Sequence, residues 1–194
     1  MYEKTYSWYN LHTSDWVKSA KMEDMSWPYS DFIPHLNPQA SILDLGCGCG
    51  RDISHFQKRG FSVHGLDASI KLCNAARQKT NAHVFCQNFD SLTLRKNHYD
   101  GIFANAVLMH VNPKSRINFL KNIYDALKSN GIFYAHFPKG EGTKVNEDGR
   151  ILHLSNAWAS LANEFNWLEE LNEGRPAFLS TEDQNWQVIR YRKS

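Results

Sequence analysis

The sequence has no uninterrupted apolar run near the roughly 20 residues that a membrane-spanning helix needs. Residues 1–16 are polar and aromatic, and they lack the basic start and apolar centre of a signal peptide. The 22 Lys and Arg residues are spread along the 194-residue chain, and the formal net charge is +2. Nucleic-acid and membrane surfaces usually gather their basic residues in blocks. We therefore expect a cytoplasmic protein without a basic surface of its own for nucleic acid or membrane.

Cysteine is scarce, with four residues in the chain. Cys47 and Cys49 form a C-x-C pair that is too close and too constrained for an ordinary disulfide or a two-ligand metal clamp. Cys73 and Cys86 stand apart from it, and no second Cys or His pair has zinc-finger spacing. The pattern predicts reduced, buried thiols and assigns no metal ligand.

Three alternate glycines, at positions 46, 48 and 50, follow a short apolar run at residues 41–45. Such a run is typical of a buried parallel strand, and the spacing of Ile53 and Phe56 after the glycines is helical. Glycine permits positive φ and leaves no Cβ between the backbone and a ligand. The following helix turns its unpaired N–H groups and positive dipole end toward the loop. This strand, loop and helix favour an anionic or hydroxyl-rich ligand.

The spacing of the loop disfavours the dinucleotide fingerprint G-x-G-x-x-G, because its third glycine, counted from Gly46, would fall at Arg51. Nicotinamide or flavin binding on a related sheet is therefore a minor alternative. The pattern present is D-x-G-x-G-x-G, which begins at Asp44. A second acid, Asp67, ends the next apolar run, residues 61–67. At the carboxyl end of a parallel strand, that carboxylate can accept both hydroxyls of a ribose.

This pattern resembles motif I of the class I S-adenosylmethionine (SAM)-dependent methyltransferases. The similarity runs from about Tyr9 to the end of the chain and is strongest over residues 41–137. It is greatest to small free-standing bacterial members whose motif I continues into Gly-Arg-Asp (DxGxGxGRD), here residues 50–52, and which carry a GEG…DGR segment, here residues 140–150. The resemblance implies an α/β, Rossmann-like three-layer sandwich, with a seven-stranded, mostly parallel sheet and an antiparallel C-terminal strand pair.

The order of elements along the chain agrees with that fold. Alternating strands and helices predict a parallel sheet with right-handed crossovers and a ligand at the carboxyl ends of its strands. Ser69 can cap a helix that runs to about Lys79, and a second helix is expected from Lys114 to Lys128. Ser155 can cap a last helix, and residues 138–150 are too polar and irregular for core. The expected later strands are residues 83–86, 99–104, 132–137, 167–171 and 186–191.

Residues 1–37 are rich in aromatic side chains and are broken by prolines, which predicts one or two short helices. By resemblance, this segment is a helical lid that folds over the cofactor, packed on the methyltransferase domain of residues 38–194. The alternative is that its aromatic side chains only pack on the flank of that domain.

The resemblance also implies a SAM site. The glycine loop would hold the methionine half, Asp67 would bind the ribose, and Asn105 would lie nearest the amino group or the methyl. For the adenine we prefer Asn88 with Phe89, while Asp90 remains a competitor. The full predicted set is Asp44, Gly46, Cys47, Gly48, Gly50, Arg51, Asp67, Ala68, Asn88, Phe89 and Asn105.

Methyl transfer from a sulfonium needs mainly alignment of the reacting groups. Where the acceptor carries a proton, a base can add roughly 10²–10⁴-fold. His110 is the best candidate for that base, and the alternative is that it orders its turn through a backbone carbonyl. Weaker candidates are His136, expected on a strand, and His153, Glu141 and Arg150, expected to be solvated loop residues.

Missing motifs narrow the acceptor. The fourth strand does not end in the Pro-Pro-aromatic box of adenine or glutamine methylation, and no Pro-Cys nucleophile or catechol-type magnesium set is present. We expect methyl transfer from SAM to a small molecule, with S-adenosylhomocysteine (SAH) as product. The alternatives are an RNA or protein methyltransferase that needs a partner, and a non-catalytic SAM-binding regulatory module.

Overall fold

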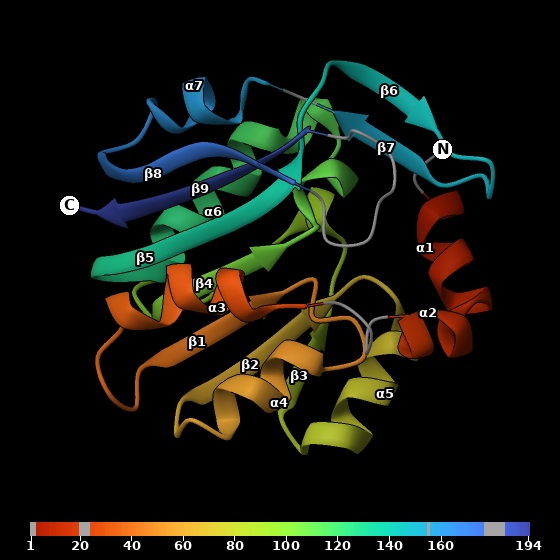
Figure 1. Cartoon of the computed structure of the whole chain (residues 1–194), viewed down its shortest axis with the longest axis horizontal. Helices are drawn as coiled ribbons and strands as arrows, with labels where there is room; N and C mark the ends of the chain where they lie inside the picture. Colours follow the sequence, from red (N-terminus) through yellow and green to blue (C-terminus); the bar gives the residue numbers. More distant parts are fainter. Residues whose placement is uncertain (1–2, 20–23, 155, 177–184) are drawn as a thin grey trace.

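The computed structural model describes residues 3–19, 24–154, 156–176 and 185–194. Its centre is a seven-stranded sheet in the order β3-β2-β1-β4-β5-β9-β8 (Figure 1). The first five of these are parallel, and β9 is antiparallel to both β5 and β8. This confirms the predicted sheet. The strands are β1 (Ser41–Leu45), β2 (Ser62–Asp67), β3 (His83–Cys86), β4 (Tyr99–Asn105), β5 (Leu127–Pro138), β8 (Trp167–Pro176) and β9 (Asn185–Lys193).

Helices cover both faces of the sheet and make a three-layer sandwich. One face buries side chains of α3 (Ser26–Phe32), α4 (Arg51–Gln57) and α5 (Ile70–Thr80). The other face buries side chains of α6 (Arg116–Ala126) and α7 (Trp158–Ala162). Consecutive side chains along a strand therefore pack into the cores on opposite faces of the sheet, because side chains alternate between the two faces.

Local sequence signals explain several helix boundaries. The Ser69 side chain accepts a hydrogen bond of 3.2 Å from the Leu72 N–H, so the predicted N-cap of α5 is confirmed. The prediction that α6 reaches Lys128 is wrong, because Leu127 is extended and pairs with Tyr99 as the first residue of β5. The last helix has Ala157 at its N-cap, not Ser155, which lies outside the described residues.

A separate antiparallel hairpin, β6 (Gly142–Val145) and β7 (Ile151–Leu154), occupies part of the segment expected to be irregular. β6 is exposed throughout, so its sequence carries no alternating apolar pattern. β7 is mostly buried. The N–H of Ile151 donates to Oγ1 of Thr5 at 3.1 Å, which joins this hairpin to the N-terminal segment.

The described residues of the N-terminal segment form three short helices, more than the one or two predicted, and these helices have different surroundings. α1 (Glu3–Leu11) and α2 (Thr13–Ser19) lie at the edge of the sheet where β1, β2 and β4 end (Figure 1). α3 instead packs into the core, where Phe32 is fully buried and Tyr29 nearly so. Within the described ranges, no helix is long and apolar enough to cross a membrane.

Candidate functional site

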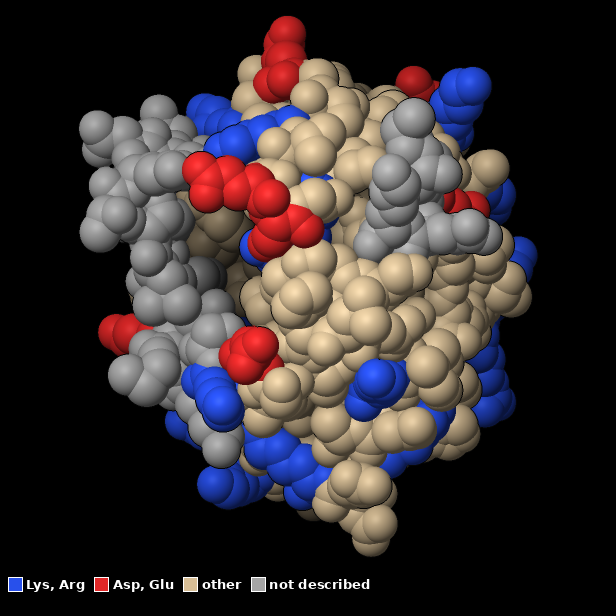
Figure 2. All heavy atoms as spheres, turned by 90° about the vertical axis from the view of Figure 1, so that its right-hand side faces the viewer, with Lys and Arg blue, Asp and Glu red and all other residues tan. Residues whose placement is uncertain are grey.

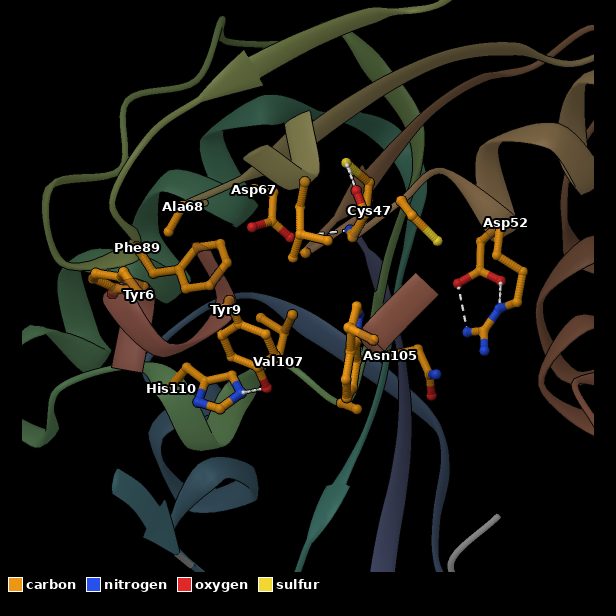
Figure 3. Close-up of a pocket in the computed structure, with 17 residues that line it drawn as sticks. Tyr6, Tyr9, Cys47, Asp52, Asp67, Ala68, Phe89, Asn105, Val107 and His110 are labelled. Atoms are coloured by element: carbon orange, nitrogen blue, oxygen red, sulfur yellow. Dashed lines mark hydrogen bonds and ion pairs between the residues drawn. The ribbon is translucent and has the colours of Figure 1, made fainter. Parts of the chain in front are cut away.

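A pocket lies at the carboxyl ends of β1, β2 and β4, with an empty volume of about 740 Å³ that includes its open mouth (Figure 3). β1 lies between β2 and β4, so the pocket occupies the point at which the strand order reverses. Its walls come from six parts of the chain. The lining residues are Tyr6, Tyr9, Trp16, Gly46, Cys47, Gly48, Cys49, Arg51, Asp52, Asp67, Ala68, Leu72, Phe89, Asn105, Ala106, Val107 and His110.

The glycine loop is fixed against β2 and bends where side chains are excluded. The N–H groups of Gly46 and Cys47 both donate to the Leu66 carbonyl, at 2.7 and 3.0 Å. Gly46 has φ +77°, and a Cβ there would lie 1.9 Å from Cγ2 of Val107. Gly50 has φ +79° and is not in the pocket lining, because it faces α5, where a Cβ would lie 3.2 Å from Ala76. Gly50 therefore serves helix packing in this structure.

The carboxylate of Asp67 stands at the rim of this loop. Oδ2 accepts from the Gly48 N–H at 3.0 Å, and Oδ1 accepts from the Ser69 N–H at 2.8 Å. Burial raises the pKa of Asp67 to about 6, against the lowering effect of these hydrogen bonds. The carboxylate is thus held in the pocket wall and becomes ionised as the pH rises through about 6.

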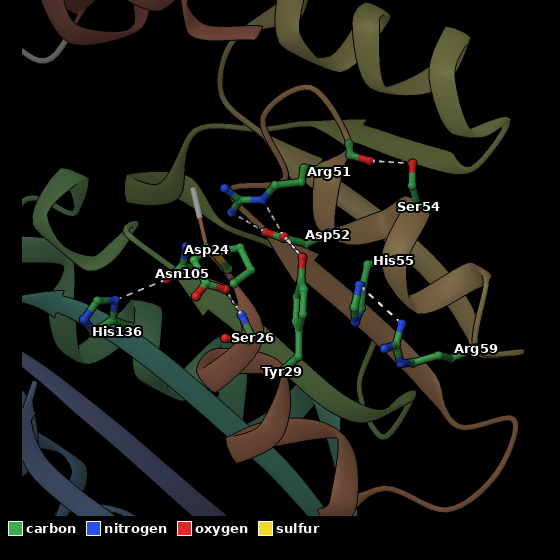
Figure 4. A network of polar contacts seen from close by, with 12 residues as sticks. Asp24, Ser26, Tyr29, Arg51, Asp52, Ser54, His55, Arg59, Asn105 and His136 are labelled. Atoms are coloured by element: carbon green, nitrogen blue, oxygen red, sulfur yellow. Dashed lines mark hydrogen bonds and ion pairs between the residues drawn. The ribbon is translucent and has the colours of Figure 1, made fainter. Parts of the chain in front are cut away.

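Two further acids lie behind the loop. Asp44 is 1% exposed, and its Oδ2 has no hydrogen-bond partner within the part of the chain that the structure describes. Burial, and secondarily the charge of Asp52, raise the pKa of Asp44 well above its usual range. Asp52 accepts two hydrogen bonds from Arg51 and one of 2.6 Å from the Tyr29 hydroxyl (Figure 4). The Arg-Asp pair after the glycines therefore ties the loop to α3.

At the other end of the pocket, Phe89 and Ala68 line the wall. The side chain of Asn88 is not in the lining and accepts from the Asp90 N–H and the Tyr6 hydroxyl, both at 2.9 Å. Oδ1 of Asp90 in turn accepts from the Asn112 N–H at 2.8 Å. Both side chains accept hydrogen bonds from backbone N–H groups here. Either Asn88 or Asp90 can therefore be the residue that contacts the adenine.

His110 lies in the pocket wall, on a 3₁₀ turn after β4 and not on a regular helix. Its Nε2 is 3.1 Å from the Tyr9 hydroxyl. Burial and then the positive charge of Arg150 lower the pKa of His110 to about 4, so the ring is neutral near pH 7. His110 therefore has the protonation state of a base, while its ring also interacts with Tyr9 of α1 and with the Ile151 backbone, so both the base and the turn-ordering role stay predictions.

The four weaker candidates for the base lie in different environments. Arg150 lies in the loop before β7, as predicted, but it is only partly solvated. Its guanidinium pairs with Asp148 at 2.8 Å and lies 4.3 Å from the centre of the Trp8 ring. His153 is also not a loop residue, since it is 5% exposed on β7. His136 is on β5 as expected, fully buried, 3.3 Å from the Asn105 amide oxygen. Glu141 is exposed.

Sequence reasoning did not assign Tyr6, Tyr9 or Trp16 individually, although all three line the pocket. The high aromatic content of residues 1–37 is the sequence feature that could have pointed to these three residues. The Trp16 ring lies directly over the loop, with Nε1 3.3 Å from the position that a Cβ of Gly48 would take.

Cys47, Cys49 and Cys73 are free and buried, whereas Cys86 is exposed, contrary to expectation. Among the residues with described positions, no group of three or more His, Cys, Asp or Glu could hold a metal ion.

Residues 42–131 match the family model described as a methyltransferase domain. This match, together with the relatives and solved structures below, supports placement in the class I SAM-dependent methyltransferase superfamily. The matched range begins in β1 and ends in β5, so it covers the glycine loop, Asp67 and His110.

Curated relatives support this placement at modest identity. The chain is 32% identical over 104 residues to a carboxy-S-adenosyl-L-methionine synthase of Campylobacter fetus subsp. fetus, which covers 51% of this chain and 44% of that protein. It is 28% identical over 167 residues to an uncharacterized methyltransferase of Schizosaccharomyces pombe, covering 82% and 61%. The chain spans about half the length of the curated relatives it matches.

Solved structures share the fold. A 1,6-didemethyltoxoflavin-N1-methyltransferase of Burkholderia thailandensis, with bound 1,6-didemethyltoxoflavin and SAH, superposes with a TM-score of 0.78 at 20% identity, covering 97% of this chain and 87% of that one. A TehB-like SAM-dependent methyltransferase of Corynebacterium glutamicum gives a TM-score of 0.74 at 20% identity, covering 95% and 99%. These likenesses establish the fold of the described domain.

Proposed function

We propose that this chain binds SAM in the pocket at the ends of β1, β2 and β4 and transfers a methyl group to a small molecule, leaving SAH. The pocket fits such a ligand on its own geometry. Gly46 and Gly48 line the pocket at positive φ, and the absence of a Cβ lets the Val107 and Trp16 side chains of the same pocket pack directly against the loop. Asp67 offers a carboxylate at the rim. Asp44 is not in the lining; its buried carboxyl group lies behind the loop, where Oδ2 lacks a partner within the described residues.

The observation that carries the proposal is the meeting of the glycine loop and Asp67 in one pocket, joined by the hydrogen bond from Gly48. A carboxylate placed there can accept the hydroxyls of a ribose. Phe89 and Ala68 would contact the adenine ring, with Asn88 or Asp90 at its edge. The loop, Asp44 and Asn105 would face the amino-acid part. When bound, SAM supplies a methyl group already activated by its positively charged sulfur.

A small acceptor is favoured by the way the pocket is covered. Tyr6, Tyr9 and Trp16, from α1 and α2, form one wall of it. We assign the lid role to these two helices, because α3 is part of the core. On the face that carries α1 and α2, acidic side chains lie mainly in the upper part and basic ones lie across the lower part and at the edges, so charges of both signs share this face (Figure 2). That distribution does not favour a nucleic-acid backbone.

Two measurements test the function. Calorimetric titration with SAM and SAH tests the cofactor, and a screen with SAM labelled in its methyl group, against metabolites and RNA, tests the transfer. Labelled small molecules support the proposal. Label in RNA alone would replace it with the RNA alternative, and SAH binding without turnover of any compound would favour a regulatory module.

A second candidate follows from the relatives named as carboxy-S-adenosyl-L-methionine synthases. Such an activity changes SAM itself, so mass spectrometry of SAM after incubation with the protein and candidate carboxylate donors would detect an added carboxyl group. A carboxylate is best held by a cation. Among the described residues lining the pocket, the one Lys or Arg is Arg51, whose guanidinium is engaged by Asp52. The pocket therefore supports methyl transfer better.

A further inference from the structure

Three side chains from distant parts of the chain form a continuous polar path at the pocket wall. Nη1 of Arg150 donates to the Tyr9 hydroxyl at 3.3 Å, and that hydroxyl lies 3.1 Å from Nε2 of His110. Arg150 is itself oriented by Asp148 and by the Trp8 ring. Tyr9 and His110 both line the pocket, as Figure 3 shows.

The direction of this path follows from the chemistry of its members. A guanidinium has only donors, so the Tyr9 oxygen accepts from Arg150. We assign the phenolic hydrogen to the contact with Nε2 of His110, which accepts it when the neutral ring carries its proton on Nδ1. The one remaining lone pair of the Tyr9 oxygen is free to accept from a ligand. Because Nε2 is occupied by Tyr9, a pocket ligand reaches His110 through the Tyr9 hydroxyl.

We propose that Tyr9 is a catalytic residue that takes a proton from the methyl acceptor while passing its own to His110. The acceptor is then a compound whose reacting atom carries hydrogen, such as a hydroxyl or an N–H group. This inference rests on the proposed methyl transfer. His110 and Arg150 are positioning residues, which act through Tyr9.

The proton balance is simple. As the acceptor atom bonds to the methyl carbon, the bond from that carbon to sulfur breaks, its electron pair stays on sulfur, and SAH is the leaving group. The acceptor's bond to hydrogen also breaks, and the proton moves to the Tyr9 oxygen. The phenolic proton moves to Nε2 of His110, whose Nδ1 is buried. After the products leave, the imidazolium returns this proton to the Tyr9 oxygen, and the Tyr9 hydroxyl releases its other proton to water in the open pocket. A weak base suffices, because an acceptor atom that gains a methyl before losing its hydrogen becomes strongly acidic.

The test uses labelled SAM with phenols, imidazoles and secondary amines, each paired with its O- or N-methylated counterpart that lacks the hydrogen. Tyr9→Phe removes only the hydroxyl, and His110→Gln keeps an acceptor for Tyr9 but cannot take its proton. Tyr99→Phe is the matched control, because the Tyr99 hydroxyl also lies 3.1 Å from a histidine ring nitrogen, Nδ1 of His64, but at the opposite end of β4 from the pocket.

We expect turnover of hydrogen-bearing compounds only. Tyr9→Phe and His110→Gln should lower kcat by about 10²–10⁴-fold, with SAH affinity retained. Wild-type turnover should slow in D₂O, and His110→Gln should lose that isotope effect, which a purely structural role of His110 would not change. Tyr99→Phe should behave as wild type.

Different results would contradict the proton path and the proposed methyl transfer. Equal methylation of the hydrogen-free counterparts, or wild-type kcat in Tyr9→Phe, would overturn the proton path alone. If SAH does not bind to the wild-type protein, the proposed function itself is wrong. If SAH binds but no compound is turned over, both are overturned.

Discussion

Replacing Gly46 by alanine perturbs the tightest point of the glycine loop, and its cost can be worked from the structure. An L-residue in the left-handed region, here φ +77°, costs about 1–2 kcal/mol. The new Cβ would lie 1.9 Å from Cγ2 of Val107, and relieving such overpacking costs a further 1–3 kcal/mol or so. Gly46→Ala should therefore lower the free energy of unfolding by about 2–5 kcal/mol.

The clash can be separated from the backbone strain by a second substitution. Val107→Ala removes Cγ2 and leaves Cβ, 3.3 Å from the new methyl group, as the nearest atom. The double variant should therefore lose less stability than the sum of the single variants, by about 1–3 kcal/mol. Gly60→Ala is the matched control, because Gly60 has φ +84° but open space around its Cβ position.

Urea unfolding of the four variants and the wild type, followed by circular dichroism, gives these free energies by linear extrapolation. Strict additivity of Gly46→Ala and Val107→Ala would refute the predicted contact. Equal costs for Gly46→Ala and Gly60→Ala would refute the idea that the loop excludes side chains at position 46.

Four further predictions concern the pocket and its surroundings. Since the raised pKa of Asp67 is about 6, SAH affinity should increase as the pH rises through 6, and Asp67→Asn should flatten this profile in calorimetric titrations. Between about pH 4 and pH 6, the free energy of unfolding of the wild type should fall relative to that of Asp67→Asn in urea unfolding. The reason is that the Asp67 carboxyl group binds its proton more tightly in the folded chain than in the unfolded chain. Tyr29→Phe leaves Asp52 with one donor fewer and should cost about 1–3 kcal/mol in the same assay; no loss would exclude a role for this bond. Arg150 contacts Tyr9 and Trp8 of α1, so Arg150→Met should speed amide hydrogen exchange in α1 but not in α5. The same α1 exchange rates in the variant and the wild type would show that Arg150 does not stabilise α1.

The parts of the fold that the sequence predicts well are those set by local patterns. The apolar run before the glycines, the Ser69 cap and the acid at position 67 each depend on neighbours within a few residues. The hairpin of β6 and β7 could not be predicted in this way, because β6 is exposed and its partner strand is short.

The site shows the same limit. The glycine loop and Asp67 were predicted as one site because parallel strands end at the same edge. The contact of Tyr9 with His110 spans 101 residues, and that of Arg150 with Tyr9 spans 141. No spacing rule encodes such contacts, since they depend on how α1 and the hairpin pack over the pocket.

The central claim is that the glycine loop and Asp67 together hold a SAM-like nucleoside. Isothermal titration of the wild type and of Asp67→Ala with SAH, and of the wild type with NAD, tests it most directly. The account predicts one SAH bound per chain, no binding of NAD, and affinity about 10–100-fold weaker in Asp67→Ala, as expected for a lost hydrogen bond to a charged group. Wild-type protein that binds NAD but not SAH, or an Asp67→Ala variant with undiminished affinity, would contradict it.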